Sequence, residues 1–453
     1  MSTSYAAIVL AAGQGSRMNS NVPKVLHRIC GTEMISLVVE AVVQSNITHI
    51  TLIVPPDHQA IDALFDSQVN YAVQNEAYGT GHALLQNQFV LNKTKNILVV
   101  SGDVPLIHPN TIRKMINLHS TQKACITLLT SNISKPHGFG RILRSPEGKI
   151  LSIVEEKQAD PEQSALTEIN AGAYCFNSPW LENNLSDLKP SNDGEFLITD
   201  LISAAVDQGL LVNSVNPINH YEVFGVNDRK QLSEVETTMR KLIRDKWMVE
   251  GVTIPDPLSV YIDAKSTIAK DTIIYPNTHI LGNSTVGIGC ELGPNSIIKN
   301  STIGDSCLVL SSIIQNSTID EKVHIGPFAH IRMKSHLQSG VYLGSHVEVK
   351  ASEIGHGTKS GHFSYIGDAI IGSNVNIGAG TVTCNYDGVE KHTTVIGDNV
   401  FIGSDSLLIA PITLGDRSTT GAGAVVTKDV PPDSKVLGIP ARDVSSRSKS
   451  LED

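Results

Sequence analysis

The chain contains 453 residues, and this length predicts at least two domains because a single hydrophobic core rarely grows beyond about 250–300 residues. Hydrophobic residues make up 41% of the sequence and the mean hydropathy is -0.01, which excludes both a disordered chain and a membrane protein. The formal net charge of -10 argues against broad binding to nucleic acid or acidic membranes, whereas small anionic ligands remain compatible with it.

The cysteines are scattered and form no C-x-x-C pair, which is typical of the reduced thiols of a cytosolic protein. The apolar run from Tyr5 to Ala12 is too short to span a membrane, and no basic segment precedes it. We therefore expect a cytoplasmic location. The cysteines are Cys30, Cys125, Cys175, Cys290, Cys307 and Cys384.

Residues 1–227 alternate between apolar runs and helical spacing, which predicts an α/β domain of the Rossmann-like type with a largely parallel sheet. Ligands of such sheets bind beyond the carboxyl ends of the strands. The glycine-rich loop after Leu10 and the carboxylate of Asp103 both fall at such ends. We expect strands at 6–10, 49–54, 69–73 and 96–100, and helices at 34–44, 61–65 and 82–89.

The loop from Leu10 to Met18 reads Leu-Ala-Ala-Gly-Gln-Gly-Ser-Arg-Met and is followed by the motif Pro-Lys-Val at Lys24. It lacks the third glycine of the dinucleotide motif and the G-K-[ST] of the P-loop. Small residues still allow backbone N–H groups to approach phosphate oxygens, and Arg17 and Lys24 can neutralise the charge. Gly-x-Gly alone also fits a plain tight turn, but the longer motif is more specific.

The full motif resembles the signature of the sugar-1-phosphate nucleotidyltransferases, or pyrophosphorylases. The resemblance implies nucleotidyl transfer, with Arg17 and Lys24 as catalytic residues and Mg²⁺ held by Asp103 and Asn227. The family usually has an aromatic residue where this chain has Ser101. The implied nucleotide and sugar contacts are Leu10, Ala11, Ala12, Gly13, Lys24, Gln74, Gly79, Thr80, Ser101, Gly102, Asp103, Gly140, Glu155, Asn170 and Asn227.

The longest helical pattern runs from Asp228 to Trp247, where apolar residues recur at three-to-four spacing. Gly251 can cap this helix and Pro255 prevents its continuation. We interpret the segment as an arm between two domains. The predicted organisation is therefore a nucleotidyltransferase domain at 1–227, a helical linker at 228–251 and a second domain at 252–453.

A branched or aliphatic residue returns every six positions through most of residues 262–430. This period predicts a left-handed parallel β-helix of hexapeptide repeats, in which each hexad forms one short strand and three hexads form one coil. The span allows about nine coils, and the usual strand spacing makes the prism roughly 45 Å long. Cys290 and Cys307 lie about one coil apart, so we expect them to be stacked and buried.

His362 stands out from the repeat because Gly361, Ser360 and Ser364 leave room around it. The segment 383–394 then breaks the six-residue rhythm, as a protruding loop would. A lone histidine on a coil surface is usually structural, but this combination favours a catalytic base.

Hexapeptide β-helices are common in acyltransferases, and residues 5–440 resemble the family of bifunctional N-acetylglucosamine-1-phosphate uridyltransferases/glucosamine-1-phosphate N-acetyltransferases. The resemblance implies a homotrimer, with UTP and acetyl-CoA as co-substrates and no nucleic-acid or membrane partner. It implies that His362 is the catalytic base and that Glu348 orients the His362 ring. Implied sugar-phosphate contacts are Arg332, Lys350, Tyr365, Asn376 and Lys391; implied acetyl-CoA contacts are Ala379, Asn385, Tyr386, Ser404, Ala422 and Arg442.

One position departs from this family, which often has an arginine near Ile439 for the CoA phosphate; Arg442 is the candidate replacement. Two other functions were weighed. A nucleotidyltransferase whose β-helix only assembles subunits would not need His362 or Lys391. A regulatory scaffold built from the same two folds would have a decayed phosphate loop, yet Lys24 and Asp103 are both present.

Overall fold

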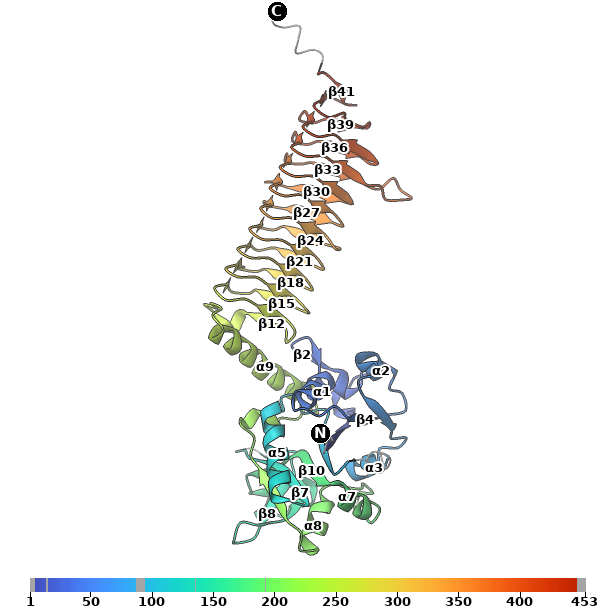
Figure 1. The fold of residues 1–453 in the computed structure, drawn as a ribbon, viewed down its shortest axis with the longest axis vertical. Coiled ribbons are helices and arrows are strands. Elements are labelled where there is room, and N and C mark those ends of the chain that lie inside the picture. The colour runs from blue at the N-terminus through green and yellow to red at the C-terminus, as the bar shows by residue number, and fades with distance from the viewer. Residues whose placement is uncertain (1–4, 14, 87–93, 135, 192, 446–453) are drawn as a thin grey trace, which may run out of the picture. The chain divides into compact units, whose positions relative to one another are not determined.

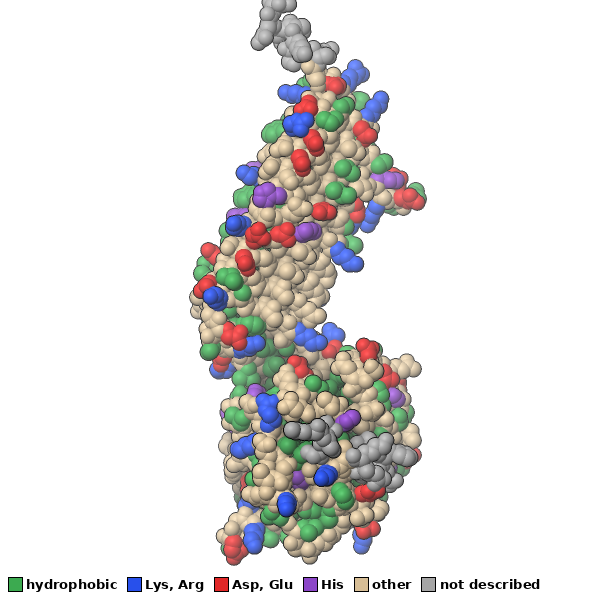
Figure 2. All heavy atoms as spheres, in the orientation of Figure 1, with side chains coloured by type: hydrophobic (Ala, Val, Ile, Leu, Met, Phe, Trp, Pro, Cys, Tyr) green, Lys and Arg blue, Asp and Glu red, His purple; other side chains and the backbone are tan. Residues whose placement is uncertain are grey.

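The computed structural model describes residues 5–13, 15–86, 94–134, 136–191 and 193–445 (Figure 1). The chain forms two compact units, residues 1–239 and 240–453, and the boundary lies within one long helix. No helix in the described ranges is long and apolar enough to cross a membrane. Figure 2 shows acidic and basic side chains interspersed over the visible face of each unit.

The first unit is built on a mixed sheet with the strand order β11-β7-β10-β6-β1-β4-β5. The four predicted strands β1, β4, β5 and β6 are parallel, as expected. The strand β10 lies antiparallel between β6 and β7, whereas β7 and β11 are parallel to each other, so β10 is the reversed strand in this order. The strands are β1 (Tyr5–Leu10), β2 (Arg28–Ile29), β3 (Thr32–Glu33), β4 (Ile50–Val54), β5 (Asn70–Val73), β6 (Asn96–Ser101), β7 (Ile126–Asn132), β8 (Arg141–Arg144), β9 (Ile150–Val154), β10 (Glu168–Asn177) and β11 (Val212–Val215).

Helices cover both faces of this sheet because alternate residues of its buried strands point to opposite sides. Ala7 and Val9 of β1 pack in one core with α1, α2 and α5, whereas Ala6 and Ile8 pack in the other with α3, α7 and α8. The predicted helix at 34–44 is confirmed. The one predicted at 82–89 is observed as α3 over Thr80–Leu85, and residues 87–89 of that prediction lie outside the described residues. The helices are α1 (Met34–Gln44), α2 (Gln59–Phe65), α3 (Thr80–Leu85), α5 (Pro109–Gln122), α6 (Pro161–Ser164), α7 (Ser178–Leu185) and α8 (Asp200–Asp207).

His119 lies on α5 with only 1% of its surface exposed, and its Nδ1 is 3.1 Å from the Thr127 hydroxyl. Its Nε2 has no partner within the described chain, so a charged ring would be buried without compensation. Burial lowers the pKa of His119 from 6.5 to about 4. The folded state therefore keeps the imidazole neutral over a pH range in which the unfolded chain is protonated.

This difference makes the stability of the first unit pH-dependent. Between pH 6.5 and about 4, His119 is protonated in the unfolded state but not in the folded state. The free energy of unfolding therefore falls as the pH drops through this range. At pH 5 we expect the loss from this group to be about 2 kcal/mol. Urea titrations of the wild type and His119→Phe at pH 7 and pH 5 measure it. Equal losses in both proteins would show that His119 does not titrate in this way.

The helix α9 (Arg229–Val249) matches the predicted arm to within two residues at its end and contains the boundary between the units. It ends at Gly251, whose φ of +95° is a left-handed conformation that favours glycine. Arg229 donates to the carbonyl of Met18 at 3.2 Å and lies 3.3 Å from His27 Nδ1. The start of this helix is therefore held against the turn that follows the predicted phosphate loop.

The second unit is a parallel β-helix made of three sheets whose strands follow each other in turn, one per hexad (Figure 1). The first sheet contains β12 (Tyr261–Ile262), β15 (His279–Leu281), β18 (Ile297–Lys299), β21 (Ile313–Gln315), β24 (His330–Arg332), β27 (Val347–Lys350), β30 (Ser364–Gly367), β33 (Val382–Cys384), β36 (Leu407–Ile409) and β39 (Val425–Val426). The second contains β13 (Thr267–Ile268), β16 (Thr285–Val286), β19 (Thr302–Ile303), β22 (Thr318–Ile319), β25 (His336–Leu337), β28 (Glu353–Ile354), β31 (Ala369–Ile371), β34 (Thr394–Ile396) and β37 (Ile412–Leu414). The third contains β14 (Ile273–Ile274), β17 (Glu291–Leu292), β20 (Leu308–Val309), β23 (His324–Ile325), β26 (Tyr342–Leu343), β29 (Lys359–Ser360), β32 (Asn376–Ile377), β35 (Phe401–Ile402), β38 (Thr419–Thr420), β40 (Lys435–Leu437) and the antiparallel β41 (Arg442–Asp443).

The six-residue rhythm corresponds to one inward side chain per strand. Ile262, Ile280 and Ile298 are direct partners on successive coils, and each is at most 2% exposed. Cys290 and Cys307 are also buried, and each precedes one of two paired strands, so the stacking prediction is confirmed. The predicted interruption is a loop that leaves the coils after β33 (Figure 1). The period therefore predicted both the regular coils and their one large irregularity.

Candidate active sites

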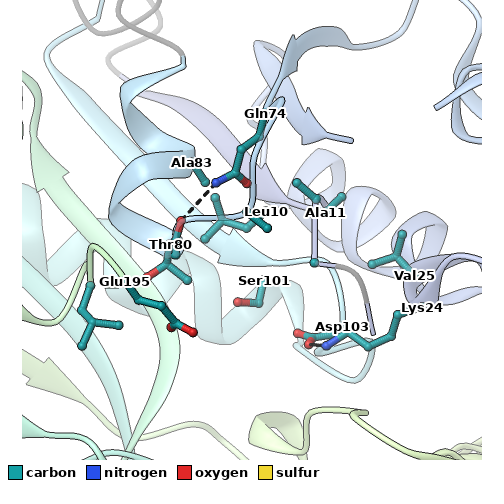
Figure 3. A pocket seen from close by; sticks show the side chains of 15 residues that line it. Leu10, Ala11, Lys24, Val25, Gln74, Thr80, Ala83, Ser101, Asp103 and Glu195 are labelled. Carbon is teal, nitrogen blue, oxygen red and sulfur yellow. Dashed lines mark hydrogen bonds and ion pairs between the residues drawn. The ribbon is translucent and has the colours of Figure 1, made fainter. Parts of the chain in front are cut away.

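A cavity of about 280 Å³ lies at the carboxyl edge of the first sheet, where Leu10 of β1 and Ser101 of β6 are paired neighbours (Figure 3). Gly102 donates its N–H to the carbonyl of Leu10 at 2.9 Å, and a side chain on this glycine would lie 3.1 Å from that oxygen. The close approach brings the predicted phosphate loop beside the Asp103 segment. The lining residues are Leu10, Ala11, Ala12, Gly13, Lys24, Val25, Gln74, Ala77, Gly79, Thr80, Ala83, Ser101, Asp103, Glu195 and Leu197.

Most of the predicted nucleotide contacts therefore meet in one cavity, and five lining residues were not predicted. Of these, Glu195 and Leu197 come from a segment far along the chain that carries no recognisable motif. They reach the cavity because Gly79 packs directly against the Phe196 backbone, where any side chain would be 2.5 Å from the carbonyl oxygen. The backbone at Gly79 has a φ of +98°, a conformation that favours glycine. The glycine itself is therefore the only sign of this contact that the sequence contains.

The ammonium group of Lys24 lies between the two predicted metal ligands. It forms an ion pair with the Asp103 carboxylate and donates to Asn227 Oδ1 at 3.2 Å. The two side-chain oxygens thus face one position that accepts a cation. A divalent metal that keeps phosphate and water as further ligands needs only one or two such protein oxygens, so the residues present fit Mg²⁺.

Arg17 is the predicted catalytic residue that the structure does not bring into this cavity. It lies exposed in the short turn Ser16–Met18, whose backbone begins and ends in the left-handed region. A guanidinium on such a turn is free to reach toward bound phosphate. Its role stays a prediction.

The predicted sugar contacts are Gly140, which directly precedes β8, Glu155, which directly follows β9, and Asn170 on β10, and all three lie outside the lining of this cavity. Thr199 donates to the Glu155 carboxylate at 3.0 Å, and burial raises the pKa of Glu155, an effect that this hydrogen bond opposes. Asn170 donates to the Tyr174 hydroxyl at 2.7 Å. Gly140 approaches Glu155 closely, because a Cβ there would lie 3.5 Å from the carboxylate. The structure therefore gathers Gly140 and Glu155 into one polar cluster.

In the second unit, Arg332 and Lys350 are direct partners on β24 and β27, and Gly367 is the next partner on β30. A side chain at Gly367 would lie 2.5 Å from the Tyr365 hydroxyl and 2.8 Å from the amide nitrogen of Asn385. Glycine at this position therefore allows the predicted contacts Tyr365 and Asn385 to stand beside the two cations.

The acid Asp368 organises this cluster and was not predicted. Its carboxylate accepts from Lys350 Nζ at 2.9 Å and from the amide of Asn385. Partial burial disfavours the charged ammonium of Lys350, but the hydrogen bond and negative charge of Asp368, together with its other neighbours, raise the pKa of Lys350. The neighbouring Lys350 lowers the pKa of Lys391, which places both lysines in one electrostatic cluster. A phosphate group would be the natural counter-charge for it.

Glu348 does not act as predicted. Its carboxylate accepts from Arg332 Nε at 2.8 Å, and no bond between Glu348 and His362 occurs among the described residues. The reason is register: Arg332 is the residue diagonal to Glu348 on the adjacent strand, within reach of a long side chain. Glu348 therefore orients the arginine of the cluster instead.

His362 belongs to a single corner of the β-helix. The strands before this corner are in register through Ser360, Ile377, Ile402 and Thr420, so the residues two positions later are stacked as well. Backbone bonds between successive corners confirm the stacking, from Gly380, Asp405 and Gly423 to the coil below. The stacked residues are His362, Ala379, Ser404 and Ala422. The predicted base thus stands at one end of a column of small residues.

The loop after β33 is braced from within. Asp387 accepts backbone N–H groups from Val389 and Glu390 at 2.8 Å and lies 2.7 Å from His392 Nε2. The hydrogen bond with His392 has the largest effect and the two backbone bonds add to it, so the pKa of Asp387 is held well below its usual range. Tyr386 and Lys391 form a bridge across the loop. The loop therefore presents both predicted contacts in a fixed arrangement.

Asn376 and Arg442 are placed elsewhere. Asn376 is on the outer face of β32, and Arg442 is exposed on β41. Within the described part of this single chain, neither contacts the Lys350 cluster. Their predicted roles therefore depend on ligands or on another copy of the chain.

Loss of the cluster's buried lysine is expected to weaken sugar-phosphate binding. Lys350→Ala should raise the KM for glucosamine-1-phosphate about tenfold or more, because a charge-assisted bond to the phosphate is lost. Steady-state acetyl transfer measures it. The control is Lys299→Ala, since Lys299 lies on the same outer column three coils below Lys350. Similar KM values in both variants would contradict a phosphate site at Lys350.

Comparison with known proteins gives matches to both units. Residues 6–222 match a family model described as nucleotidyl transferase, and residues 393–428 match one described as hexapeptide repeat of succinyl-transferase. The "Bifunctional protein GlmU" of Geotalea uraniireducens is 42% identical over 95% of this chain and 96% of its own. The protein of the same name from Carboxydothermus hydrogenoformans is 41% identical over 98% and 99%. A crystal structure of UDP-glucose pyrophosphorylase complexed with UDP-glucose covers 52% of this chain and 99% of its own, with 17% identity and a TM-score of 0.46.

The two folds and the family models that they match define an enzyme that joins a nucleotidyltransferase to a hexapeptide-repeat acyltransferase. The similarity covers nearly the full length of this chain and of its relatives, so it identifies the family more specifically than either fold alone. The chain belongs to the family of bifunctional GlmU proteins and has the uridyltransferase and acetyltransferase activities of UDP-N-acetylglucosamine synthesis. A nucleotidyltransferase of this family uses a divalent metal ion and acts on small-molecule substrates.

Proposed function

We propose that the two sites act in sequence on one sugar phosphate. The β-helix transfers acetyl from acetyl-CoA to the 2-amino group of glucosamine-1-phosphate, and the first unit transfers uridylyl from UTP to the product. The observation that supports this proposal is the cluster of Arg332, Lys350 and Lys391, whose positive charge suits a sugar phosphate, in the unit that also holds His362. We assign the two catalytic domains to residues 1–227 and 252–453, with α9 between them.

In the first unit, a sugar-phosphate oxygen attacks the α-phosphorus of UTP; the bond to the β-phosphate oxygen breaks and pyrophosphate leaves. Mg²⁺, when bound by Asp103 and Asn227, supplies neutralisation of the triphosphate charge. Lys24 and Arg17 add positive charge, and backbone groups at 10–13 hold the phosphates. Catalysis by this site is therefore mainly positioning and charge neutralisation.

The remaining contacts of the first unit divide between base and sugar. Gln74, Gly79 and Thr80 take the uracil ring, since all three line the cavity. Gly140, Glu155 and Asn170 take the sugar, and Ser101 and Gly102 form the floor between them.

In the second unit, His362 removes a proton from the attacking amine as nitrogen bonds to the thioester carbonyl carbon. The carbon–sulfur bond then breaks and CoA leaves as its thiolate, which takes up a proton. Backbone N–H groups near Ala379 stabilise the oxyanion of the intermediate. The small corner residues leave room for an extended acyl carrier alongside the coils. Sugar contacts are Arg332, Lys350, Tyr365, Asn376 and Lys391; acetyl-CoA contacts are Ala379, Asn385, Tyr386, Ser404, Ala422 and Arg442.

The upper coils support a homotrimer. Phe363, Ile370 and Phe401 are each more than half exposed, and apolar side chains of this size favour a partner surface. A trimer would also bring Asn376 and Arg442 of one copy near the cluster of another. The reduced, scattered cysteines support a cytoplasmic location.

The test is to incubate the purified protein with glucosamine-1-phosphate, acetyl-CoA, UTP and Mg²⁺, omitting one component at a time. Without acetyl-CoA neither free CoA nor nucleotide sugar should form. Without UTP or Mg²⁺ acetylation should continue and stop at N-acetylglucosamine-1-phosphate. Efficient uridylylation of the unacetylated sugar would contradict the proposed order.

A further inference from the structure

The amide group of Gln74 is held in one orientation by the cavity wall. Gln74 is buried, and its Nε2 lies 3.2 Å from the Gly79 carbonyl and 3.0 Å from His82 Nδ1. A backbone carbonyl only accepts hydrogen bonds, so the NH₂ end of the amide must face Gly79. Figure 3 shows this bond beside Thr80, with the Gln74 oxygen on the other side of the amide.

Both hydrogens of the Gln74 amide are therefore used inside the wall. One is donated to Gly79, and the second is directed at His82 Nδ1, which must accept it. The oxygen of the Gln74 amide remains as the group that the cavity offers to a ligand.

Packing holds the His82 ring in the position that this bond requires. Tyr78 meets it edge to face at a centroid distance of 5.4 Å, and Phe196 lies on another side at 6.3 Å. His82 is in the first turn of α3, so its backbone is set by the helix that begins after Gly79. The ring is thus positioned before any ligand arrives.

We propose that His82 is a positioning residue that makes the site select uracil over cytosine, by fixing the Gln74 amide with its oxygen toward the base. This inference rests on the proposed placement of the base at Gln74. Uracil has an N–H at ring position 3, which pairs with an acceptor. Cytosine has an unprotonated nitrogen there, which would face the same oxygen and leave both acceptors unpaired in a desolvated site.

The His82 ring therefore contributes to specificity without touching the substrate. If Nδ1 is removed, the second amide hydrogen of Gln74 loses its acceptor, and the bond to the Gly79 carbonyl alone opposes rotation of the amide. A rotated amide presents NH₂ to the cavity and accommodates cytosine as well. Discrimination between the two bases should then fall, while groups that act on the phosphates stay in place.

The experiment compares kcat and KM for UTP and CTP in the full-length wild type, His82→Phe and His82→Asn, with N-acetylglucosamine-1-phosphate and Mg²⁺. Phenylalanine keeps the ring packing but has no acceptor, whereas the asparagine oxygen can replace Nδ1. We expect His82→Phe to lower the UTP/CTP ratio of kcat/KM about tenfold or more, mainly by raising the KM for UTP. His82→Asn should keep the ratio within about threefold. A kcat for UTP within about threefold of wild type shows that the first unit of each variant is folded.

Gln74→Ala separates failure of this inference from failure of the proposed base site. A KM for UTP unchanged in Gln74→Ala would show that the base does not bind there, and the inference would fall with it. If Gln74→Ala loses discrimination but His82→Phe retains the wild-type ratio, the base site stands and His82 has no part in selecting the base. Equal losses in His82→Phe and His82→Asn would also overturn the role of Nδ1.

Discussion

Replacing His362 with alanine is expected to lower acetyl transfer by about a hundredfold to ten-thousandfold, the usual contribution of a positioned general base. Uridylyl transfer to N-acetylglucosamine-1-phosphate should stay within twofold of wild type, or about 0.4 kcal/mol. The selectivity follows from structure: His362 belongs to the β-helix, whereas the cavity with Lys24 and Asp103 belongs to the other unit. Release of free CoA and of pyrophosphate, measured on one preparation, gives both rates.

The matched control is His346→Ala. His346 is exposed in the turn one coil below and packs beside Phe328 at a centroid distance of 5.2 Å. It shares the residue type and the setting of His362 but not its place in the column of small residues. If His346→Ala lost acetyl transfer as completely, or if both activities fell together in His362→Ala, His362 would not be the base.

Replacing Asp103 with alanine should have the opposite pattern and an effect of similar size. Uridylyl transfer should fall by about a hundredfold or more, because the position that Asp103 shares with Asn227 loses its only charged oxygen. Acetyl transfer should be unchanged. A higher Mg²⁺ requirement in Asp103→Asn, which keeps one neutral oxygen, would mark the loss as one of metal binding.

The control for Asp103 is Asp57→Ala. Asp57 also follows the carboxyl end of a parallel strand, β4, but it is exposed and lies outside the cavity lining. Its replacement should leave both activities as they are. Full uridylyl transfer in Asp103→Ala would exclude this carboxylate from the metal site, whatever the effect of Asp57→Ala.

Much of the fold follows from two sequence periods. The helix α1 was predicted to the residue because Ile35, Val38 and Val42 recur on one face and are all buried. The β-helix was predicted because its strands each bury one side chain, which leaves the same mark every six residues. The antiparallel β10 was not predicted, because its place between β6 and β7 depends on pairing with distant segments.

The candidate sites also contain some residues that the sequence predicted and others that only the tertiary structure revealed. Motifs predicted roles for Lys24, Asp103, His362 and Lys350, since phosphate, metal and proton chemistry require particular residue types. No local pattern marked Asp368, whose carboxylate receives both Lys350 and the Asn385 amide. Hydrogen-bond partners of this kind are set by which coils lie next to each other.

The sequence by itself determined which chemical groups this protein carries and the period at which its coils repeat, because both are local properties of the chain. The tertiary structure alone decided what those groups face. Stacking of unequal coils aligned His362 with Ala379 and Ser404, although their spacings in the sequence differ. The Gly79 carbonyl and His82 Nδ1 together decided which end of the Gln74 amide faces the cavity, because a hydrogen bond depends on distance and direction in space rather than on sequence.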